Sequence, residues 1–186
     1  DLLSDVAEFR RPAPIAAEID GLEAEDQADL VNDLASRLVS PKANALRICL
    51  LDTGVSAAHP LLAPAINLDD THVVDDAWSD ADVRDHGTGL AGIALYGDVA
   101  EALLRAGDQE LPLRLESVKI IADTGESERE LWGAVTAEAV ALVEIASPTS
   151  DRVFVLSATA PHDGPVDPAA AGIPTSWSAS LDALVA

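Results

Sequence analysis

The sequence predicts an α/β fold in which a parallel β-sheet is flanked by helices. Three short apolar runs, at 46–51, 115–122 and 152–158, are hydrophobic without alternation, which is typical of strands buried on both faces. Segments with helical spacing of apolar residues lie among them, and strands that alternate with helices favour a parallel sheet with right-handed crossovers. With 186 residues the chain is long enough to build such a core as one domain.

An amphipathic helix is predicted near the N-terminus, within a segment that precedes the main domain. Residues 1–43 form this segment, and 1–21, which contain two prolines, are expected to be irregular. From 23 to 38 apolar side chains recur at helical spacing, at Leu30, Val31, Leu34 and Leu38. Acidic residues fall in the first turn and Arg37 in the last, which suits the helix dipole. The leucine stripe is expected to pack on the main domain, residues 44–186.

The main domain is expected to begin with a strand and to continue by alternation. Leu46–Leu51 is the first strand, and it ends at Asp52. The stretch 55–85 has many aspartates and no clear periodicity, so we expect a long loop with short helical turns. After His86 we expect a helix that includes Leu90, Ile93 and Ala94 and continues toward Leu103. A strand at 115–122, a helix at 128–146 and a strand at 152–158 should follow. The tail at 161–186 contains no complete strand–helix unit.

Two polar residues are predicted to meet at the carboxyl end of this sheet. In an open parallel sheet, reactive groups gather where strands end and helices begin. Asp52 ends the first strand, and Gly54 permits the close turn that lets the carboxylate project from the sheet. His86 lies just before a helix, so its ring is expected over the same edge. A buried carboxylate bonded to one ring nitrogen would fix the tautomer and leave the other nitrogen as a general base.

Short motifs surround both residues. Leu50-Leu51-Asp52-Thr53-Gly54-Val55 is followed by His59-Pro60-Leu61, and Asp85-His86-Gly87-Thr88 is followed by Leu90-Ala91-Gly92. A later run reads Val153-Phe154-Val155-Leu156-Ser157. In their order, these segments resemble the aspartate motif, the histidine motif and the specificity-pocket strand of the subtilisin-like serine peptidases. Gly89 stands where that family usually has a second histidine, and the resemblance covers about Leu46 to Ala160, roughly the first half of a subtilisin catalytic domain.

This resemblance implies a three-layer α/β/α fold, truncated in this chain, and a serine endopeptidase that hydrolyses polypeptide substrates. It implies that Asp52 and His86 are the catalytic aspartate and histidine of an Asp-His-Ser triad. The residues that it implies for substrate binding are Val155, Leu156, Ser157 and Ala158. Leu95–Asp98 and the ending around Trp177-Ser178 are similar to a bacterial branch of the family, which implies an AAA-type ATPase as a partner.

The serine of the family, which stands in a Gly-Thr-Ser context, is missing after His86. The resemblance places that serine and an oxyanion-hole asparagine beyond residue 186. We therefore expect the chain alone to be inactive, and its exposed sheet edge to favour self-association. Thr175–Ala179 is superficially similar to the serine motif, but Pro174 replaces the glycine, so we expect a loop near the substrate cleft there. The alternative is a non-catalytic binding or regulatory domain, a pseudo-protease.

A different protease class shares the tripeptide Asp52-Thr53-Gly54 after an apolar pair. In aspartic proteases of the retroviral type, two such aspartates share a proton in an all-β dimer. The helical periodicity at 23–38 and 128–146 argues against that fold, which would also leave the histidine motif unexplained.

The composition argues against several classes of function. A net charge of −22, from 33 acidic and 11 basic residues, repels phosphate backbones and anionic lipids, so neither nucleic acid nor a membrane surface is expected as a partner. No apolar stretch is long enough to cross a membrane and no signal peptide is visible, from which we expect a cytoplasmic location. The single cysteine, Cys49, lies in an apolar run and is expected to be a buried structural thiol.

No cofactor is expected, although one segment is rich in calcium-type ligands. Its carboxylates belong to Asp69, Asp70, Asp75, Asp76, Asp80, Asp82 and Asp85. Such oxygens suit calcium, but their spacing fits no EF-hand loop, which favours a solvated acidic loop. His59 is expected to shape the turn before Pro60.

Overall fold

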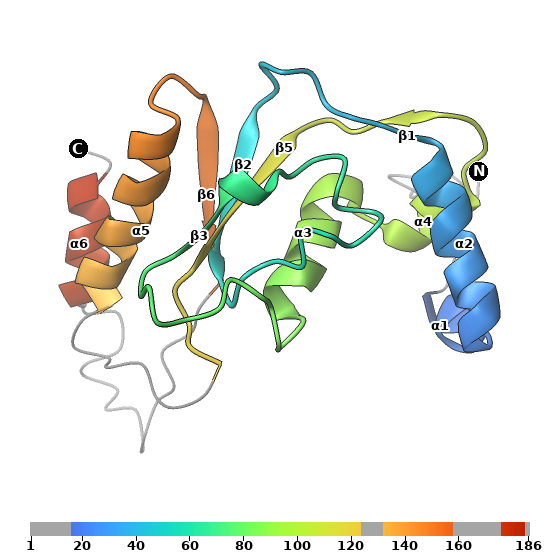
Figure 1. The fold of residues 1–186 in the computed structure, drawn as a ribbon, viewed down its shortest axis with the longest axis horizontal. Coiled ribbons are helices and arrows are strands. Elements are labelled where there is room, and N and C mark those ends of the chain that lie inside the picture. Colours follow the sequence, from blue (N-terminus) through green and yellow to red (C-terminus); the bar gives the residue numbers. More distant parts are fainter. Residues whose placement is uncertain (1–15, 124–131, 158–175, 185–186) are drawn as a thin grey trace, which may run out of the picture.

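The computed structural model describes residues 16–123, 132–157 and 176–184, in which helices cover both faces of a parallel sheet (Figure 1). The helices are α1 Ala16–Asp20, α2 Ala24–Ser36, the short η1 Leu68–Asp70, α3 His86–Tyr96, α4 Val99–Leu104, α5 Trp132–Ala146 and α6 Ser176–Leu184. The strands are β1 Leu38–Val39, β2 Arg47–Asp52, β3 Thr71–Val73, β4 Gln109–Glu110, β5 Arg114–Lys119 and β6 Arg152–Leu156. This architecture confirms the predicted α/β fold and excludes the all-β alternative.

The main sheet has the strand order β3-β5-β2-β6, and every pairing in it is parallel. The three strands predicted from apolar runs are β2, β5 and β6, and they lie side by side. β2 is between the other two, with Arg47 in register with both Arg114 and Arg152. A separate pair, β1 with β4, forms a second, two-stranded parallel sheet.

Successive residues of β2 point to opposite faces of the sheet, and each face has its own apolar cluster. Leu50 packs on the side of α3, where Leu95 contributes from the helix. Cys49 and Leu51 pack on the side of α5, where Val143 contributes. Burial on both faces is what the continuous apolar run predicted. Burial also raises the pKa of the Cys49 thiol, which suits the structural role expected of it.

The predicted N-terminal helix is α2, which lies next to α4 beside the main sheet (Figure 1). Its leucine stripe packs on α4. Leu34 is fully buried there, in a cluster with Leu61 and Leu103. The helix ends at Ser36, earlier than predicted, because Arg37 is its cap and the next residues form β1. The prediction that residues 1–21 are irregular is wrong at 16–20, where α1 lies.

Residues 55–85 contain more regular structure than the predicted loop. β3 pairs with β5, with Thr71 opposite Ser117, and η1 precedes it. A three-residue strand with a polar sequence is too short to show a periodicity, which explains why it was missed. The single helix expected after His86 is divided at Gly97, whose φ of 66° ends α3. α4 begins anew after Asp98, which accepts hydrogen bonds from the first backbone N–H groups of that helix.

The C-terminal part of the chain adds a helix that the sequence did not predict. α6 packs on the side of α5 that faces away from the sheet (Figure 1). The ring of Trp177 lies 4.8 Å from that of Trp132, and its Nε1 donates to Thr136 Oγ1 at 3.0 Å. The prediction of a loop near a substrate cleft is therefore wrong for Ser176 and Ser178, which lie in this outer helix. The predicted helix at 128–146 is confirmed from Trp132 onward, and 128–131 lie outside the described residues.

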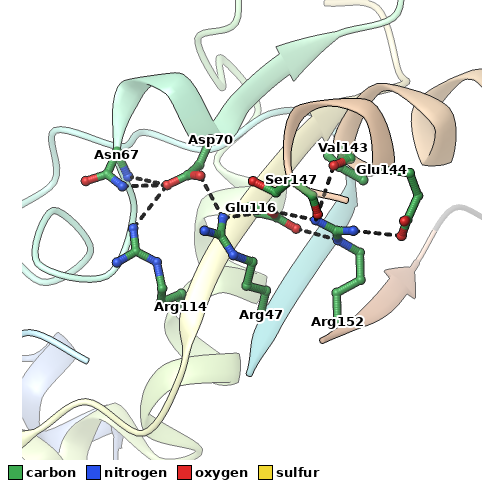
Figure 2. Close-up of polar contacts among 9 residues, drawn as sticks. All are labelled: Arg47, Asn67, Asp70, Arg114, Glu116, Val143, Glu144, Ser147 and Arg152. Carbon is green, nitrogen blue, oxygen red and sulfur yellow. Dashed lines mark hydrogen bonds and ion pairs between the residues drawn. The ribbon is translucent and has the colours of Figure 1, made fainter. Parts of the chain in front are cut away.

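A cluster of ion pairs crosses the amino end of the main sheet, and we call it the arginine cluster (Figure 2). It consists of Arg47, Arg114, Arg152, Asp70, Glu116 and Glu144. Glu116, buried on β5, accepts hydrogen bonds from Arg47 at 2.8 Å and from Arg152 at 2.9 and 3.0 Å. Asp70 accepts from Arg47 at 2.8 Å and from Arg114 at 3.4 Å. The first residues of three adjacent strands are thus linked through carboxylates.

The aspartate-rich segment is only partly the solvated loop that was predicted. Asp70 and Asp82 are buried and hydrogen-bonded, whereas the other five aspartates of the set are exposed. Within the described ranges, no group of three or more His, Cys, Asp and Glu side chains is placed to hold a metal ion. In the same ranges, no helix has the length and apolar character needed to cross a membrane.

Candidate active site

Asp52 is the last residue of β2, at the carboxyl end of the sheet, and its side chain is buried. The chain turns sharply behind it at Gly54, where φ is 101°. A Cβ at Gly54 would collide with the backbone carbonyl of Asp80, so this position requires glycine for space as well as for conformation. The turn directs the carboxylate toward the helix that follows in the chain.

His86 is the first residue of that helix, α3, rather than the residue before it as predicted. Its cap, Asp85, has the left-handed backbone conformation, with φ of 57°. The Nδ1 atom of His86 lies 2.7 Å from Asp52 Oδ1. The side chain of His86 is 55% exposed, whereas that of Asp52 is 2% exposed. The predicted pair is therefore formed, with a buried carboxylate and a half-exposed imidazole.

The backbone of the two segments is in close contact. A Cβ at Gly87 would lie far inside contact distance of the carbonyl oxygen of Gly54. Helix α3 can therefore begin directly against the turn after β2 only because residue 87 has no side chain. This packing brings the imidazole of His86 over the end of β2.

Asp52 has further hydrogen-bond donors that the sequence did not reveal. The backbone N–H of Thr53 donates to Oδ1 at 2.8 Å, and the hydroxyl of Ser157 donates to Oδ2 at 2.6 Å. Burial alone would raise the pKa of Asp52, but the hydrogen bonds from Ser157, His86 and Thr53 outweigh it and lower that pKa. Asp52 is thus an anion at neutral pH, as a partner for a protonated imidazole must be.

The arrangement has a defined chemical capacity. With Nδ1–H donated to Asp52, the neutral imidazole keeps its lone pair on Nε2, which is then the atom able to accept a proton. When Nε2 becomes protonated, the ion pair with Asp52 stabilises the imidazolium. The pair has the geometry of a general base with a fixed tautomer, and such a base would need a nucleophile to act upon. The 186 residues contain no Gly-Thr-Ser segment.

The residues predicted to bind substrate lie beside this pair. Val155 and Leu156 are on β6, which neighbours β2, and Ser157 follows directly after the strand. Val155 packs on the α3 side of the sheet and Leu156 on the α5 side. Ser157 points to Asp52, a contact across 105 positions of sequence that no local pattern indicates. Ala158 lies outside the described residues.

His59 forms part of the turn that leads away from Asp52. Its Nδ1 accepts a hydrogen bond from the backbone N–H of Leu61 at 3.2 Å, and its carbonyl accepts from Leu62 N and Ala63 N. These contacts agree with the turn-shaping role predicted for this histidine.

Comparison with known proteins gives one match. The model of the subtilase family, peptidase family S8, matches residues 43–185 of the chain. That range contains β2, β5, β6, α3 and α5, and with them Asp52 and His86. Searches among curated proteins and among solved structures returned no significant match.

Proposed function

The chain belongs to the subtilase family, and on this premise we propose that Asp52 and His86 are the aspartate and histidine of an Asp-His-Ser triad in a serine endopeptidase. The observation that carries the proposal is the 2.7 Å contact between His86 Nδ1 and Asp52 Oδ1 at the carboxyl end of a parallel sheet. Ligands and reactive groups of open α/β sheets gather at that end. The proposal is based on geometry and charge, not on the presence of either residue alone.

In the proposed reaction, His86 Nε2 removes the proton of a serine hydroxyl as the serine attacks the peptide carbonyl. Asp52 stabilises the imidazolium that forms, and His86 then delivers the proton to the leaving amine. An acyl-enzyme remains and is hydrolysed by the same base acting on water. The proposal requires a serine from outside residues 1–186, because this part contains no Gly-Thr-Ser segment. The 186-residue chain alone is expected to be inactive.

The strand β6 supports a role in holding the substrate. Within the described sheet, β6 pairs with β2 on one side only, so its other edge offers backbone hydrogen-bonding groups. An extended peptide can add to such an edge as a further strand. We propose that Val155, Leu156 and Ser157, with Ala158, bind the substrate backbone next to His86.

Two preparations test the proposed function, the 186-residue chain and the complete gene product. A fluorophosphonate probe should leave the 186-residue chain unlabelled and should label the complete product, which should also cleave casein. His86→Ala in the complete product should lower kcat by about a million-fold, the loss that subtilisin shows when its histidine or serine is removed. His72→Ala, which removes a histidine of β3, a strand that is not adjacent to β2, is the matched control and should keep activity.

Each other outcome has a definite meaning. Labelling of the 186-residue chain would overturn the prediction that it is inactive alone. A folded complete product that neither reacts with the probe nor cleaves casein would favour the non-catalytic, regulatory alternative. Activity that survives His86→Ala would remove this histidine from the reaction.

A further inference from the structure

Asp82 is a buried carboxylate that the reaction described above does not use. It lies four residues before His86, in the segment between β3 and α3. Its Oδ1 accepts from the hydroxyl of Thr53 at 2.8 Å and from the backbone N–H of Arg84 at 3.1 Å. Its Oδ2 accepts from the backbone N–H of Thr88 at 2.8 Å and from the hydroxyl of Thr88 at 2.7 Å. Four donors therefore converge on one side chain.

Only a carboxylate satisfies all four donors. Each oxygen of Asp82 faces a backbone N–H, of Arg84 on one side and of Thr88 on the other, and a backbone N–H cannot become an acceptor. An amide at this position would place its own NH2 group against one of these donors. Burial raises the pKa of Asp82, but the hydrogen bonds from Thr88 and Thr53 outweigh it and lower that pKa, so the group is charged at neutral pH.

The charge on Asp82 decides where two hydroxyl protons point. The hydroxyl of Thr88 donates to Asp82, and its oxygen is therefore free to accept from Ser56 N at 3.0 Å. The hydroxyl of Thr53 has one proton and two carboxylates within reach, Asp82 Oδ1 at 2.8 Å and Asp52 Oδ1 at 3.1 Å. With the proton toward Asp82, the same oxygen accepts from Gly87 N at 3.1 Å.

These hydroxyls connect the two motifs. The backbone N–H of Gly87 donates a hydrogen bond to the hydroxyl of Thr53, and that of Ser56 donates to the hydroxyl of Thr88. Both hydrogen bonds join the segment of Asp52 to the segment of His86. The loop that carries Asp82 is itself held from the sheet, because the buried ammonium of Lys119 on β5 donates to the carbonyl of Ala81 at 2.6 Å. Lys119 is paired in turn with Asp123 at 2.6 Å. Asp82 is thus a fixed point rather than a flexible surface acid.

We propose that Asp82 is a positioning residue, which draws the protons of Thr53 and Thr88 to itself and so keeps Asp52 Oδ1 for His86 Nδ1. Without this anion, the hydroxyl of Thr53 turns to Asp52 Oδ1, the oxygen that His86 binds, and the bridge from Thr88 to Ser56 loses its orientation. The imidazole is then held less firmly. The proposal rests on the proposed function for its biological meaning, but the Asp52–His86 hydrogen bond can be observed whether or not the protein is a peptidase.

The test observes the proton between His86 Nδ1 and Asp52 directly. Such a proton gives a proton NMR signal far downfield of the amide region, and its loss in His86→Ala assigns it in the 186-residue chain. Asp82→Asn is expected to abolish that signal while the methyl signals of the core around Leu51 persist. Asp80→Asn, which removes one charge from an exposed side chain of the same loop, should leave it in place.

Two threonine variants keep the test decisive where Asp82→Asn fails to fold. Thr88→Ser retains the hydroxyl and should retain the signal, whereas Thr88→Val should lose or broaden it with the core signals unchanged. In the complete gene product, Asp82→Asn should lower kcat with little change in KM, since Asp82 touches no substrate. An unchanged downfield signal in Asp82→Asn, an equal loss in Asp80→Asn, or an unchanged signal in a folded Thr88→Val would each overturn the proposal.

Discussion

Strand β2 has a charged residue at each end, and the two ends are built differently. At the amino end, Arg47 lies in the arginine cluster, whose pairs are mostly enclosed (Figure 2). At the carboxyl end, Asp52 is also buried, but the side chain of its partner His86 is 55% exposed. Most pairs at the amino end have both members enclosed, whereas the pair at the carboxyl end has only its anion enclosed.

This difference assigns stability to one end of β2 and chemistry to the other. Buried ion pairs are costly to break, because the partner that remains is an uncompensated charge in a poorly solvated site. A buried acid with a half-exposed base is suited instead to holding a group in one protonation geometry while that group meets another molecule. The amino end should therefore decide whether the sheet is stable, and the carboxyl end what the sheet can do.

The largest effect on stability is expected at the amino end, from Glu116→Gln. The change leaves Arg47 and Arg152 without the carboxylate that they share, and breaking a buried pair in this way costs about 3–5 kcal/mol of unfolding free energy. Glu144→Gln is the matched control, because its side chain is 47% exposed and its loss should cost less than about 1 kcal/mol. Urea denaturation measures both. Equal losses for the two variants would contradict an enclosed amino end.

The second effect concerns the close contact at the carboxyl end. Gly87→Ala places a methyl group against the carbonyl of Gly54 and should cost about 1–3 kcal/mol, while it separates His86 from Asp52. Gly89→Ala, in the same helix, meets no atom within 4 Å and should be neutral or stabilise by up to about 1 kcal/mol. Thermal unfolding compares the two. If Gly87→Ala leaves the stability unchanged, the turn after β2 and the start of α3 need not be in direct contact.

A change of pH acts on both ends at once. The pKa values of Asp52, Asp70 and Asp82 are all lowered in the folded chain, against the effect of burial, by hydrogen bonds, and at Asp70 also by the charge of Arg47. A carboxyl with a lowered folded pKa stabilises the fold above its unfolded pKa of about 3.9, and this stabilisation is lost as the pH falls through the folded pKa.

The midpoint of thermal unfolding should therefore decline as the pH falls below about 4. Asp70→Asn should remove the amino-end share of this acid dependence, and Asp82→Asn the carboxyl-end share. A midpoint of thermal unfolding that rises on acidification would contradict the predicted direction of this pH dependence.

The smallest effect on stability is expected from His86→Ala. The imidazole is half-exposed, and Asp52 keeps its hydrogen bonds from Ser157 and Thr53, so the loss should be below about 1 kcal/mol. Arg152→Ala, at the opposite end, removes an enclosed cation and should cost about 3–5 kcal/mol. Urea denaturation of both variants, side by side, sharpens the contrast. A cost for His86→Ala as large as that for Arg152→Ala would remove the distinction between the two ends.

Much of the fold could be predicted because buried strands and long helices leave strong local patterns. The apolar run of β2 and the leucine stripe of α2 are such patterns, and both elements were found. β3 was missed because three residues show no period, and α6 because its packing on α5 depends on a contact between Trp177 and Trp132 that lie far apart in the chain. Local patterns carry no information of this kind.

The sequence predicted the pair of Asp52 and His86 but not the network of hydrogen bonds around it. Asp52 and His86 were found because each lies in a recognisable motif at a strand end or a helix start. The hydrogen-bond donors to Asp52 could not be predicted, since Ser157 reaches Asp52 only after β6 has paired with β2. Asp82 was predicted to be solvated because it stands among exposed aspartates, and only folding of the loop over β5 buries it.

The buried position of Lys119 has a practical consequence. The chain contains two lysines, and Lys119 is fully buried whereas the side chain of Lys42 is 77% exposed. Among side-chain amines, reagents such as activated esters should therefore react at Lys42 and spare Lys119. Lys42 lies in the connection that leads into the amino end of β2. A molecule tethered through it to a bead or sensor surface would present the opposite end, with Asp52 and His86, to the solution.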